Sequence, residues 1–240
     1  MLIQSPIQSP GPPPLLSFKQ VACRRDSRTL FAGIDYAINT GDIVQITGPN
    51  GIGKTTLLRA IMGLMPDYDG EIHWQGQLID NARYDFTREL LFIGHLTGVK
   101  KSLTPRENLQ FLANLQGSAN LSEIDDALEQ VGLYGYEDML GDQLSAGQYR
   151  RVALARLYLS QTLVWVLDEP YTALDIEAVA SLEALFVAHA NQGGCVIFTS
   201  HQAPSIAELK VLSLTDFQSQ PFQSQPFQSQ PLWNEGDYEK

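Results

Sequence analysis

Three observations predict that this chain folds as an α/β domain with a mainly helical insertion. Short β-rich segments alternate along the chain with segments whose apolar residues recur at helical spacing. A glycine-rich turn joins one of these strands directly to one of these helices. A further stretch, of about residues 96–144, carries repeated signals for the starts and ends of helices.

The composition predicts one folded body with a polar tail at each end. The chain has 240 residues, of which 44% are hydrophobic and 18% charged, as is ordinary for a globular protein. Proline recurs near the N-terminus, and Phe-Gln-Ser-Gln-Pro occurs three times from Phe217 to Pro231, which is typical of low-complexity sequence. A peptide motif for a partner is the alternative interpretation of that repeat. We therefore expect a disordered tail over residues 1–17, a folded domain over 18–215 and a low-complexity tail over 216–240.

Charge and hydropathy argue against several classes of protein. The chain has 27 acidic and 16 basic residues, and the resulting net charge of −11 argues against a broad surface for nucleic acid or anionic lipid. No run of 18 apolar residues predicts a membrane span, and the first residues do not resemble a signal peptide. Cys23 and Cys195 lie far apart without metal-ligand spacing, so we expect two free thiols.

The first predicted elements run from strand to turn to helix. Asp42–Thr47 has the composition of a buried strand. The helix predicted over Lys54–Met62 has its apolar residues on one face and ends before Gly63. Two more strands are expected at Glu71–Trp74 and Leu90–Ile93.

Helix signals dominate the middle of the chain. Thr104 can cap a helix, Pro105 suits its first turn, and Glu107 can return the capping bond. A second helix is predicted over Ser122–Gln130, so the segment 96–144 is expected to be mostly helical. The alternation then resumes, with a strand at Leu163–Leu167, a helix at Glu177–Ala190 and a strand at Cys195–Thr199.

The glycine-rich turn carries the sharpest chemical signal. It matches the pattern G-x-x-x-x-G-K-[ST] with the residues Gly48, Pro49, Asn50, Gly51, Ile52, Gly53, Lys54 and Thr55. Glycines let successive backbone N–H groups surround phosphate oxygens, and the positive end of the following helix points at the same anion. Lys54 can reach the β- and γ-phosphates, and Thr55 can offer its hydroxyl to Mg²⁺. A chance glycine-rich turn is the alternative, which the placement between strand and helix disfavours.

Two carboxylates follow the strand predicted at Leu163–Leu167. In open α/β sheets ligands lie at the carboxyl ends of the strands, so Asp168 is expected near the phosphate-binding loop. There it can hold Mg²⁺, through water, and Glu169 can orient and polarise an attacking water. The alternative is that both residues are solvated carboxylates at the end of a strand.

The segment Leu144-Ser145-Ala146-Gly147-Gln148 precedes a helix with an apolar pattern. Ser145 and Gln148 have the spacing of a capping box, which is a structural interpretation. The same helix N-terminus, with its serine hydroxyl and Gly147, is also a potential anion site. The residues alone leave open whether two such helix ends meet one nucleotide.

Taken together, these segments resemble the nucleotide-binding domain of an ABC ATPase. The resemblance rests on Gly48–Thr56, Leu144–Gln148, Leu167–Pro170, Thr172–Asp175 and His201, in this order. It implies a P-loop NTPase of ABC ATPase type over residues 18–215, with a mainly α-helical subdomain between the phosphate loop and the Ser145 segment. It also implies a head-to-tail homodimer. In that dimer, Gly48–Thr56 of one copy and Ser145, Gly147 and Gln148 of the other enclose each ATP.

The resemblance also implies roles for single residues. Glu169 is expected to be the catalytic carboxylate, and His201 to act as a switch at the γ-phosphate. Asp175 is expected at the dimer seam. The residues expected to hold Mg²⁺ are Thr55 and Asp168, and Thr56 joins the ATP contacts.

Two residues depart from the family pattern. His95 stands where the family usually has a glutamine near Mg²⁺ and water, and imidazole can donate or accept a hydrogen bond there. Arg25 stands near the usual position of an aromatic residue that stacks on adenine, and a guanidinium plane can also stack on a base. We expect both in the site; an exposed basic loop is the alternative for Arg25.

These departures point to a subfamily. The segments Cys23–Phe31, Ile93–His95, Gly98–Lys100 and Ser145–Leu157 resemble the ATP-binding subunit of the cytochrome c biogenesis haem exporter, the CcmA family. This implies an ATPase that uses ATP and Mg²⁺ and energises integral membrane subunits for haem export or release of a haem chaperone. It implies a cytoplasmic location, peripheral on the cytoplasmic face of the bacterial inner membrane.

Several alternatives remain open at this point. The histidines form no paired spacing and the cysteines no haem-attachment pattern, so this chain is predicted to make no direct haem ligation. An ATPase subunit of another exporter, for drugs or lipids, differs only in its partners. An ABC ATPase acting on ribosomes or DNA is disfavoured by the acidic single domain. A binding module with little turnover is suggested by His95 and Arg25, but Lys54, Glu169 and His201 argue against it.

Overall fold

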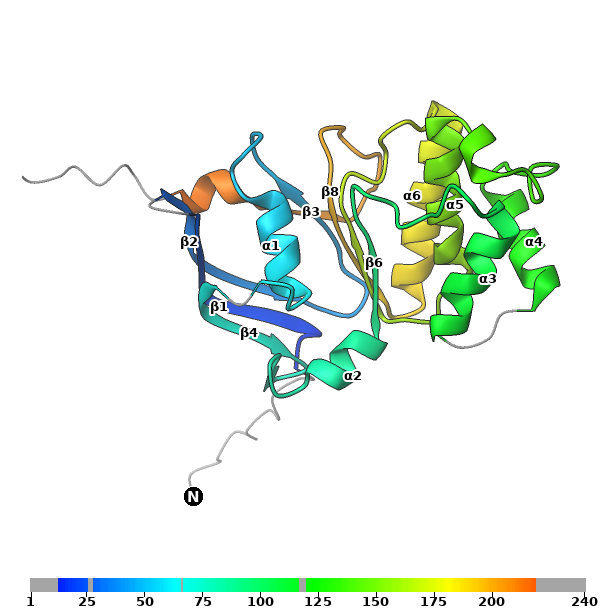
Figure 1. The fold of residues 1–240 in the computed structure, drawn as a ribbon. Helices are drawn as coiled ribbons and strands as arrows, with labels where there is room; N and C mark the ends of the chain where they lie inside the picture. Colours follow the sequence, from blue (N-terminus) through cyan, green and yellow to red (C-terminus); the bar gives the residue numbers. More distant parts are fainter. Residues whose placement is uncertain (1–12, 26–27, 66, 117–119, 219–240) are drawn as a thin grey trace, which may run out of the picture.

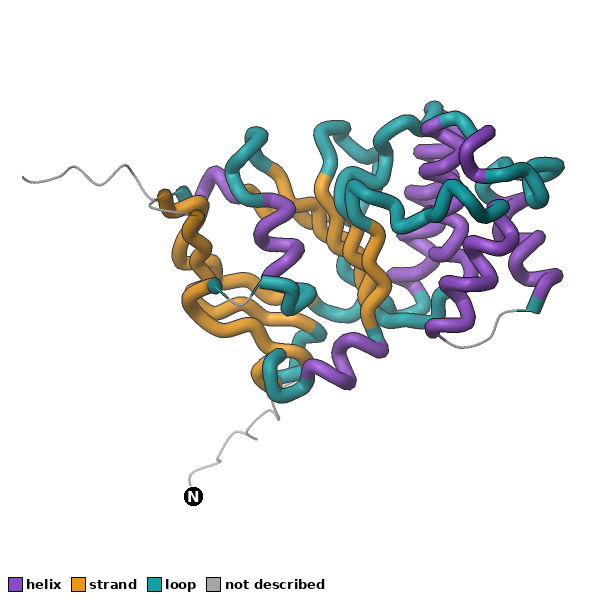
Figure 2. Tube along the Cα trace, viewed as in Figure 1, coloured by secondary structure: helices purple, strands orange, loops and turns teal. Residues whose placement is uncertain are grey.

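The computed structural model describes residues 13–25, 28–65, 67–116 and 120–218. These residues form an antiparallel sheet, a parallel sheet and a group of helices (Figure 1). Most of the helical turns lie on one side of the molecule, beside the strands (Figure 2). Of the tails predicted over 1–17 and 216–240, residues 1–12 and 219–240 lie outside the described residues. Within the described ranges, no helix combines the length and the apolar character needed to cross a membrane.

Five strands form a parallel sheet, which confirms the predicted α/β class. Their order is β6 (Leu90–Ile93), β7 (Val164–Leu167), β8 (Cys195–Thr199), β3 (Ile43–Thr47) and β9 (Leu209–Ser213). Every residue of β7 and β8 is buried, as expected for strands that are covered on both faces. Because all neighbouring strands run the same way, the segments that follow β3, β7 and β8 emerge at one edge.

The antiparallel sheet is predicted only in part by the sequence. Its order is β2 (Arg28–Ile38), β1 (Leu16–Arg25), β4 (Tyr68–Trp74) and β5 (Gln77–Leu78), and only part of β4 shows a clear strand pattern. In β1 the alternation breaks at Gln20, where φ is 51° and the pairing with β2 shifts register. Such a bulge interrupts the period of two by which a strand is identified in a sequence.

The parallel sheet separates two apolar layers. In β3, Val44 and Ile46 face the layer that contains the antiparallel sheet and α1 (Lys54–Ile61), whereas Ile43 faces the opposite layer. Figure 1 shows α1 between the two sheets. On the other side lie α5 (Ala146–Leu159) and α6 (Ile176–Asn191), while the short α2 (Arg83–Arg88) precedes β6. The parallel sheet is therefore covered on both faces.

The predicted helical insertion consists of α3 (Pro105–Gln116), α4 (Leu121–Gln130) and the short 3₁₀ helix η1 (Gly141–Gln143), with loops between them. Both bonds of the capping box predicted for α3 are present. The Glu107 N–H donates to the Thr104 hydroxyl over 3.2 Å, and the Thr104 N–H donates to the Glu107 carboxylate over 2.9 Å. Helix α4 begins one residue earlier than predicted because Asn120 caps it. Both helices pack against α5.

Both cysteines are buried and free, as the sequence predicts. Burial, with a smaller contribution from Asp69, raises the pKa of the Cys23 thiol to about 11. Burial, with a smaller contribution from Asp42, raises the pKa of the Cys195 thiol to about 12. Thiols of this kind stay protonated near neutral pH and are therefore poor nucleophiles.

The folded part extends beyond both boundaries expected from the sequence. Leu16 is fully buried in β1, before the expected start at residue 18. Phe217, after the expected end at residue 215, closes the 3₁₀ helix η2 (Leu214–Phe217) and packs against the core. Phe217 is the first phenylalanine of the C-terminal repeat, and it belongs to the fold because it packs against the apolar core.

Removal of residues 219–240 is expected to leave the thermal unfolding midpoint unchanged, because the described core contacts all precede Gln218. Circular dichroism of the shortened chain during heating measures this midpoint. As a control, a chain that ends at Asp216 also loses Phe217 and should unfold at a lower temperature. Equal midpoints for the two shortened chains, both well below that of the full chain, would contradict the expectation.

Candidate functional site

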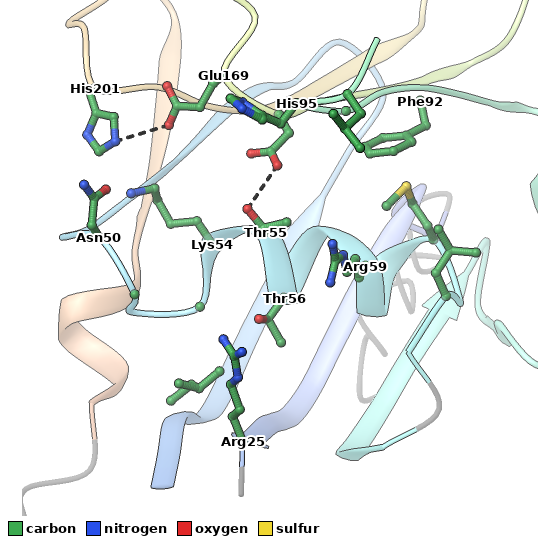
Figure 3. A pocket seen from close by; sticks show the side chains of 18 of the residues that line it. Arg25, Asn50, Lys54, Thr55, Thr56, Arg59, Phe92, His95, Glu169 and His201 are labelled. Atoms are coloured by element: carbon green, nitrogen blue, oxygen red, sulfur yellow. Dashed lines mark hydrogen bonds and ion pairs between the residues drawn. The ribbon is translucent and has the colours of Figure 1, made fainter. Parts of the chain in front are cut away.

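A cavity of about 1230 Å³ opens where β3, β7 and β8 end. In Figure 3, Lys54 and Thr55 project from the start of α1 on the side where Glu169 and His201 lie on other loops, and Thr56 projects from the same helix toward Arg25. Segments that lie far apart in the sequence therefore meet in one place. The predicted site residues that line the cavity are Arg25, Asn50, Gly51, Gly53, Lys54, Thr55, Thr56, His95, Asp168, Glu169 and His201.

The loop between β3 and α1 has a backbone that favours glycine. The φ angle is 139° at Gly48, 78° at Gly51 and 116° at Gly53. A Cβ atom on Gly53 would lie 2.9 Å from the ring of Phe31, so this position also excludes a side chain sterically. Helix α1 then begins at Lys54 without a side-chain cap, which leaves its first N–H groups available to an anion.

Three predicted loop residues support the loop and do not line the cavity. The Gly48 carbonyl accepts a hydrogen bond from the Lys54 ammonium over 2.8 Å. The Pro49 carbonyl accepts one from the Ile52 N–H over 3.3 Å, and the Ile52 side chain is buried. The loop therefore closes on itself and holds the Lys54 ammonium above it.

A hydroxyl–carboxylate network joins α1, β7 and β8. The Thr55 hydroxyl donates to Asp168 Oδ2 over 3.0 Å (Figure 3), and the Thr199 hydroxyl donates to Asp168 Oδ1 over 2.7 Å. Hydroxyl and carboxylate oxygens are the ligands that Mg²⁺ prefers, and it usually takes only one or two from protein while phosphate and water supply the rest. Thr55 and Asp168 fit that role. In the part of the chain that the structure describes, no group of three or more His, Cys, Asp or Glu residues could hold a metal.

Glu169 is held in an unusual backbone conformation. Its φ is 51°, in a region that costs a residue with a side chain about 1–3 kcal/mol. The Glu169 N–H donates to the Thr199 hydroxyl over 2.9 Å, and the Glu169 carbonyl accepts from Arg150 over 2.9 Å. Its carboxylate lies 3.5 Å from His201 Nε2 (Figure 3). In this backbone conformation, the partly exposed carboxylate of Glu169 lies at the cavity.

His95 and Arg25 line the same cavity from different elements. His95 follows the end of β6, whereas Arg25 ends β1 and lies beyond Thr56 in Figure 3. The adjacent Arg24 instead faces Asp69 at 3.7 Å on the antiparallel sheet. Contact of His95 and Arg25 with a nucleotide stays a prediction.

The Ser145 segment lies away from this cavity. The Gln148 N–H donates to the Ser145 hydroxyl over 3.3 Å, and the Ser145 N–H donates to Gln148 Oε1 over 2.9 Å, so the capping box is present. None of Ser145, Gly147 and Gln148 lines the cavity of its own chain, and Ser145 is exposed. A contact between this segment and a nucleotide would therefore need a second copy of the chain.

Asp175 lies near the Ser145 segment. Its carboxylate accepts the Ala178 N–H over 2.8 Å, which caps α6, and it also pairs with Arg151 of α5. A Cβ atom on Gly147 would lie 2.8 Å from the Ala173 carbonyl oxygen, so the loop before Asp175 packs closely against the start of α5. The Asp175 side chain is 60% exposed, and its place at a dimer seam stays a prediction.

Two further residues, Thr199 and Arg150, hold the site together, and the sequence alone does not reveal their role. Thr199 bonds both Asp168 and Glu169, and Arg150 bonds the carbonyls of the same two residues. The only signal for Thr199 is a hydroxyl residue at the end of an apolar strand, just before His201. Arg150 lies in the segment Ser145–Leu157 that carries part of the resemblance, but its role has no signal in the sequence, because its burial depends on which face α5 presents to the sheet.

Replacing Thr199 by valine is expected to lower the free energy of unfolding by about 1–3 kcal/mol, because Asp168 and the Glu169 N–H both lose a buried partner. Valine keeps the shape of threonine, so the lost hydroxyl dominates the effect. Urea unfolding of the variant and the wild type measures the difference. Thr199→Ser keeps the hydroxyl and should retain most of the stability; an equal loss in both variants would show that packing of the methyl group decides.

Comparisons with known proteins point to one family. The family model described as ABC transporter matches residues 31–172. A cytochrome c biogenesis ATP-binding export protein CcmA from Colwellia psychrerythraea is 51% identical over 189 residues, covering 79% of this chain and 86% of the relative. The protein of the same name from Escherichia coli strain K12 is 48% identical over 203 residues, covering 84% and 97%.

A solved structure gives the same result for the fold. An ABC transporter ATP-binding protein from Pyrococcus furiosus superposes with a TM-score of 0.74 at 29% sequence identity, covering 85% of this chain and 99% of that one.

Proposed function

This chain belongs to the CcmA family of ABC transporter ATP-binding subunits, and from that premise we propose that it hydrolyses ATP for a membrane export complex in c-type cytochrome biogenesis. One observation carries the proposal. The phosphate loop, Asp168, Glu169 and His201 converge on one cavity in a chain about half identical to relatives of that name. The exported or released species is haem or a haem chaperone.

ATP binds with its phosphates on the loop between β3 and α1. The backbone N–H groups of Asn50 to Lys54 surround the phosphate oxygens, and Thr55 and Thr56 follow at the start of α1. The Lys54 ammonium, which lies 2.8 Å from the Gly48 carbonyl, exchanges that partner for β- and γ-phosphate oxygens. Arg25, at the other end of the cavity, supports the adenine by stacking.

For hydrolysis, the γ-phosphate of the bound ATP lies next to Glu169 and His201. Glu169 accepts a proton from the attacking water, and its distance of 3.5 Å from His201 keeps both groups close to the same phosphate. Thr55 and Asp168 would hold Mg²⁺, which when bound neutralises charge on the phosphates. His95, which follows the end of β6, contacts the attacking water directly or through a second water.

Two copies of the chain complete two sites. Ser145, Gly147 and Gln148 lie outside the cavity of their own chain, and Ser145 is exposed, which supports a contact with ATP in the partner copy. Asp175 is close to that segment and lies at the seam. Since the γ-phosphate then contacts both copies, ATP favours the closed dimer and hydrolysis favours opening.

Membrane subunits receive this motion on the cytoplasmic face of the inner membrane. The helical region of α3 and α4 moves with α5, on which it packs. The partners, and not this chain, hold haem. In support of that, His189 stacks on Trp165 with ring centroids 3.7 Å apart, and His73 is buried beside Glu71.

A gene deletion tests the pathway. We expect loss of c-type cytochromes, seen by haem staining of separated membrane proteins, with recovery when the wild-type gene is returned but not the Lys54→Ala gene. Normal cytochromes together with a drug- or lipid-related phenotype would favour the alternative, an ATPase subunit of another exporter.

A further inference from the structure

Arg150 is a buried cation that the reaction described above does not use. It lies on α5, just over one turn after Ser145, and is 6% exposed. Its guanidinium donates to the Gly94 carbonyl over 2.8 Å. It also donates to the carbonyls of Asp168 and Glu169, over 3.0 and 2.9 Å. One side chain of α5 therefore connects the ends of β6 and β7.

The geometry of arginine suits this position. Its planar group presents several N–H donors in a fixed arrangement, so it can serve carbonyls from two chain segments at once. Burial lowers the pKa of Arg150, and the nearby carboxylates of Asp168 and Glu169 oppose that shift. Arginine stays charged in proteins, so these are charge-assisted hydrogen bonds, which are the stronger kind.

The backbone of Glu169 depends on these bonds. Its φ of 51° is unfavourable for a residue with a side chain, and such conformations persist only where neighbours hold them. Thr199 accepts from the Glu169 N–H and Arg150 donates to the Glu169 carbonyl, so both polar groups of this residue are fixed. The direction of the carboxylate follows from that backbone.

We propose that Arg150 is a positioning residue that holds Glu169 in its left-handed conformation and, through Gly94, holds the start of the loop that carries His95. Arg150 does not itself line the cavity or bond to the phosphate loop. It bonds only to the backbone carbonyls of Gly94, Asp168 and Glu169, so it acts on the rate of hydrolysis through Glu169 and leaves ATP binding alone. The proposal rests on the proposed role of Glu169 as the catalytic carboxylate.

Five variants of the full chain test it. Arg150→Lys keeps the charge but cannot span the three carbonyls, and Arg150→Gln removes the charge as well. Glu169→Gln removes the carboxylate and is combined with Arg150→Lys in a double variant. Arg156→Gln is the matched control. Arg156 is a half-buried arginine of α5 and donates to β6 at the Phe92 carbonyl over 3.2 Å, without a bond to Asp168 or Glu169.

The expected result is a split between turnover and binding. Arg150→Lys should lower kcat about tenfold or more, as small displacements of catalytic groups do, with KM for ATP within about twofold. Arg156→Gln should keep wild-type kcat. On the Glu169→Gln background, Arg150→Lys should lower the residual rate much less than it lowers the wild-type rate, because the main group through which it acts has been removed.

Several outcomes would overturn the proposal. These are an unchanged kcat in both Arg150 variants, the same loss in Arg156→Gln, or a full additional loss on the Glu169→Gln background. Variants of Arg150 that no longer bind ATP by calorimetry, or that unfold, would show that Arg150 holds the fold and not the carboxylate. If Glu169→Gln itself keeps wild-type turnover, the proposed role of Glu169 fails; if only the Arg150 variants keep it, the inference about Arg150 fails alone.

Discussion

Glu169→Gln is expected to bind ATP normally while its hydrolysis falls about tenfold or more, the range for loss of a general base. Glutamine has nearly the size of glutamate and can adopt the same backbone, held by Thr199 and Arg150. It cannot accept a proton from water near neutral pH. The unhydrolysed γ-phosphate should then keep two copies together. Phosphate release measures the rate, and size-exclusion chromatography with ATP and Mg²⁺ measures the dimer.

Glu208→Gln provides the control for this change. Glu208 is exposed and directly precedes β9. It therefore lies at the amino end of that strand, whereas the cavity opens at the carboxyl ends of the parallel strands. This variant should match the wild type in rate and should not form a stable dimer with ATP. Wild-type turnover in Glu169→Gln would remove Glu169 from its proposed role. A monomer with ATP bound but unhydrolysed would instead contradict the proposed sharing of ATP between two copies.

Lys54→Ala is expected to lose nucleotide binding. The ammonium can make about two charge-assisted hydrogen bonds to phosphate, worth about 1.5–3 kcal/mol each, so affinity should fall about 100-fold or more. Alanine keeps the helix propensity at the first position of α1, so the fold should survive. Titration calorimetry with ATP and Mg²⁺ measures the affinity.

Lys19→Ala is the matched control for the lost charge. Lys19 lies on β1, is 62% exposed and faces Glu71 at 3.6 Å. Exposed ion pairs contribute little, so this variant should bind ATP with wild-type affinity. Normal affinity in Lys54→Ala would mean that the loop does not hold the phosphates, and the proposed function would fail with it.

The local pattern of the chain predicted its strongest elements well. The strand before Gly48, the helix after it and the capping box at Thr104 depend on neighbouring residues, and the structure has all three. The strands β1, β2 and β9 were not predicted. A bulge at Gln20 interrupts the alternation in β1, and the edge strand β9 exposes Lys210 and Val211.

The residues of the candidate site also differ in how far the sequence predicts them. Lys54 and Thr55 are recognisable because the loop and its helix are continuous in sequence. Thr199 and Arg150 are not, since each acquires its partners only when other segments fold against it.

The sequence by itself determined the phosphate loop and the carboxylates after β7, because each depends on residues that lie close together along the chain. The order of several such short motifs indicated the family. Only the tertiary structure decided which segments meet. The parallel sheet brings the ends of β3, β7 and β8 to one edge, and α5 turns Arg150 toward the Glu169 backbone. The tertiary structure also keeps Ser145 away from the cavity of its own chain, because α5 and α1 lie on opposite faces of the parallel sheet. Such contacts depend on packing between distant segments, which no local pattern encodes.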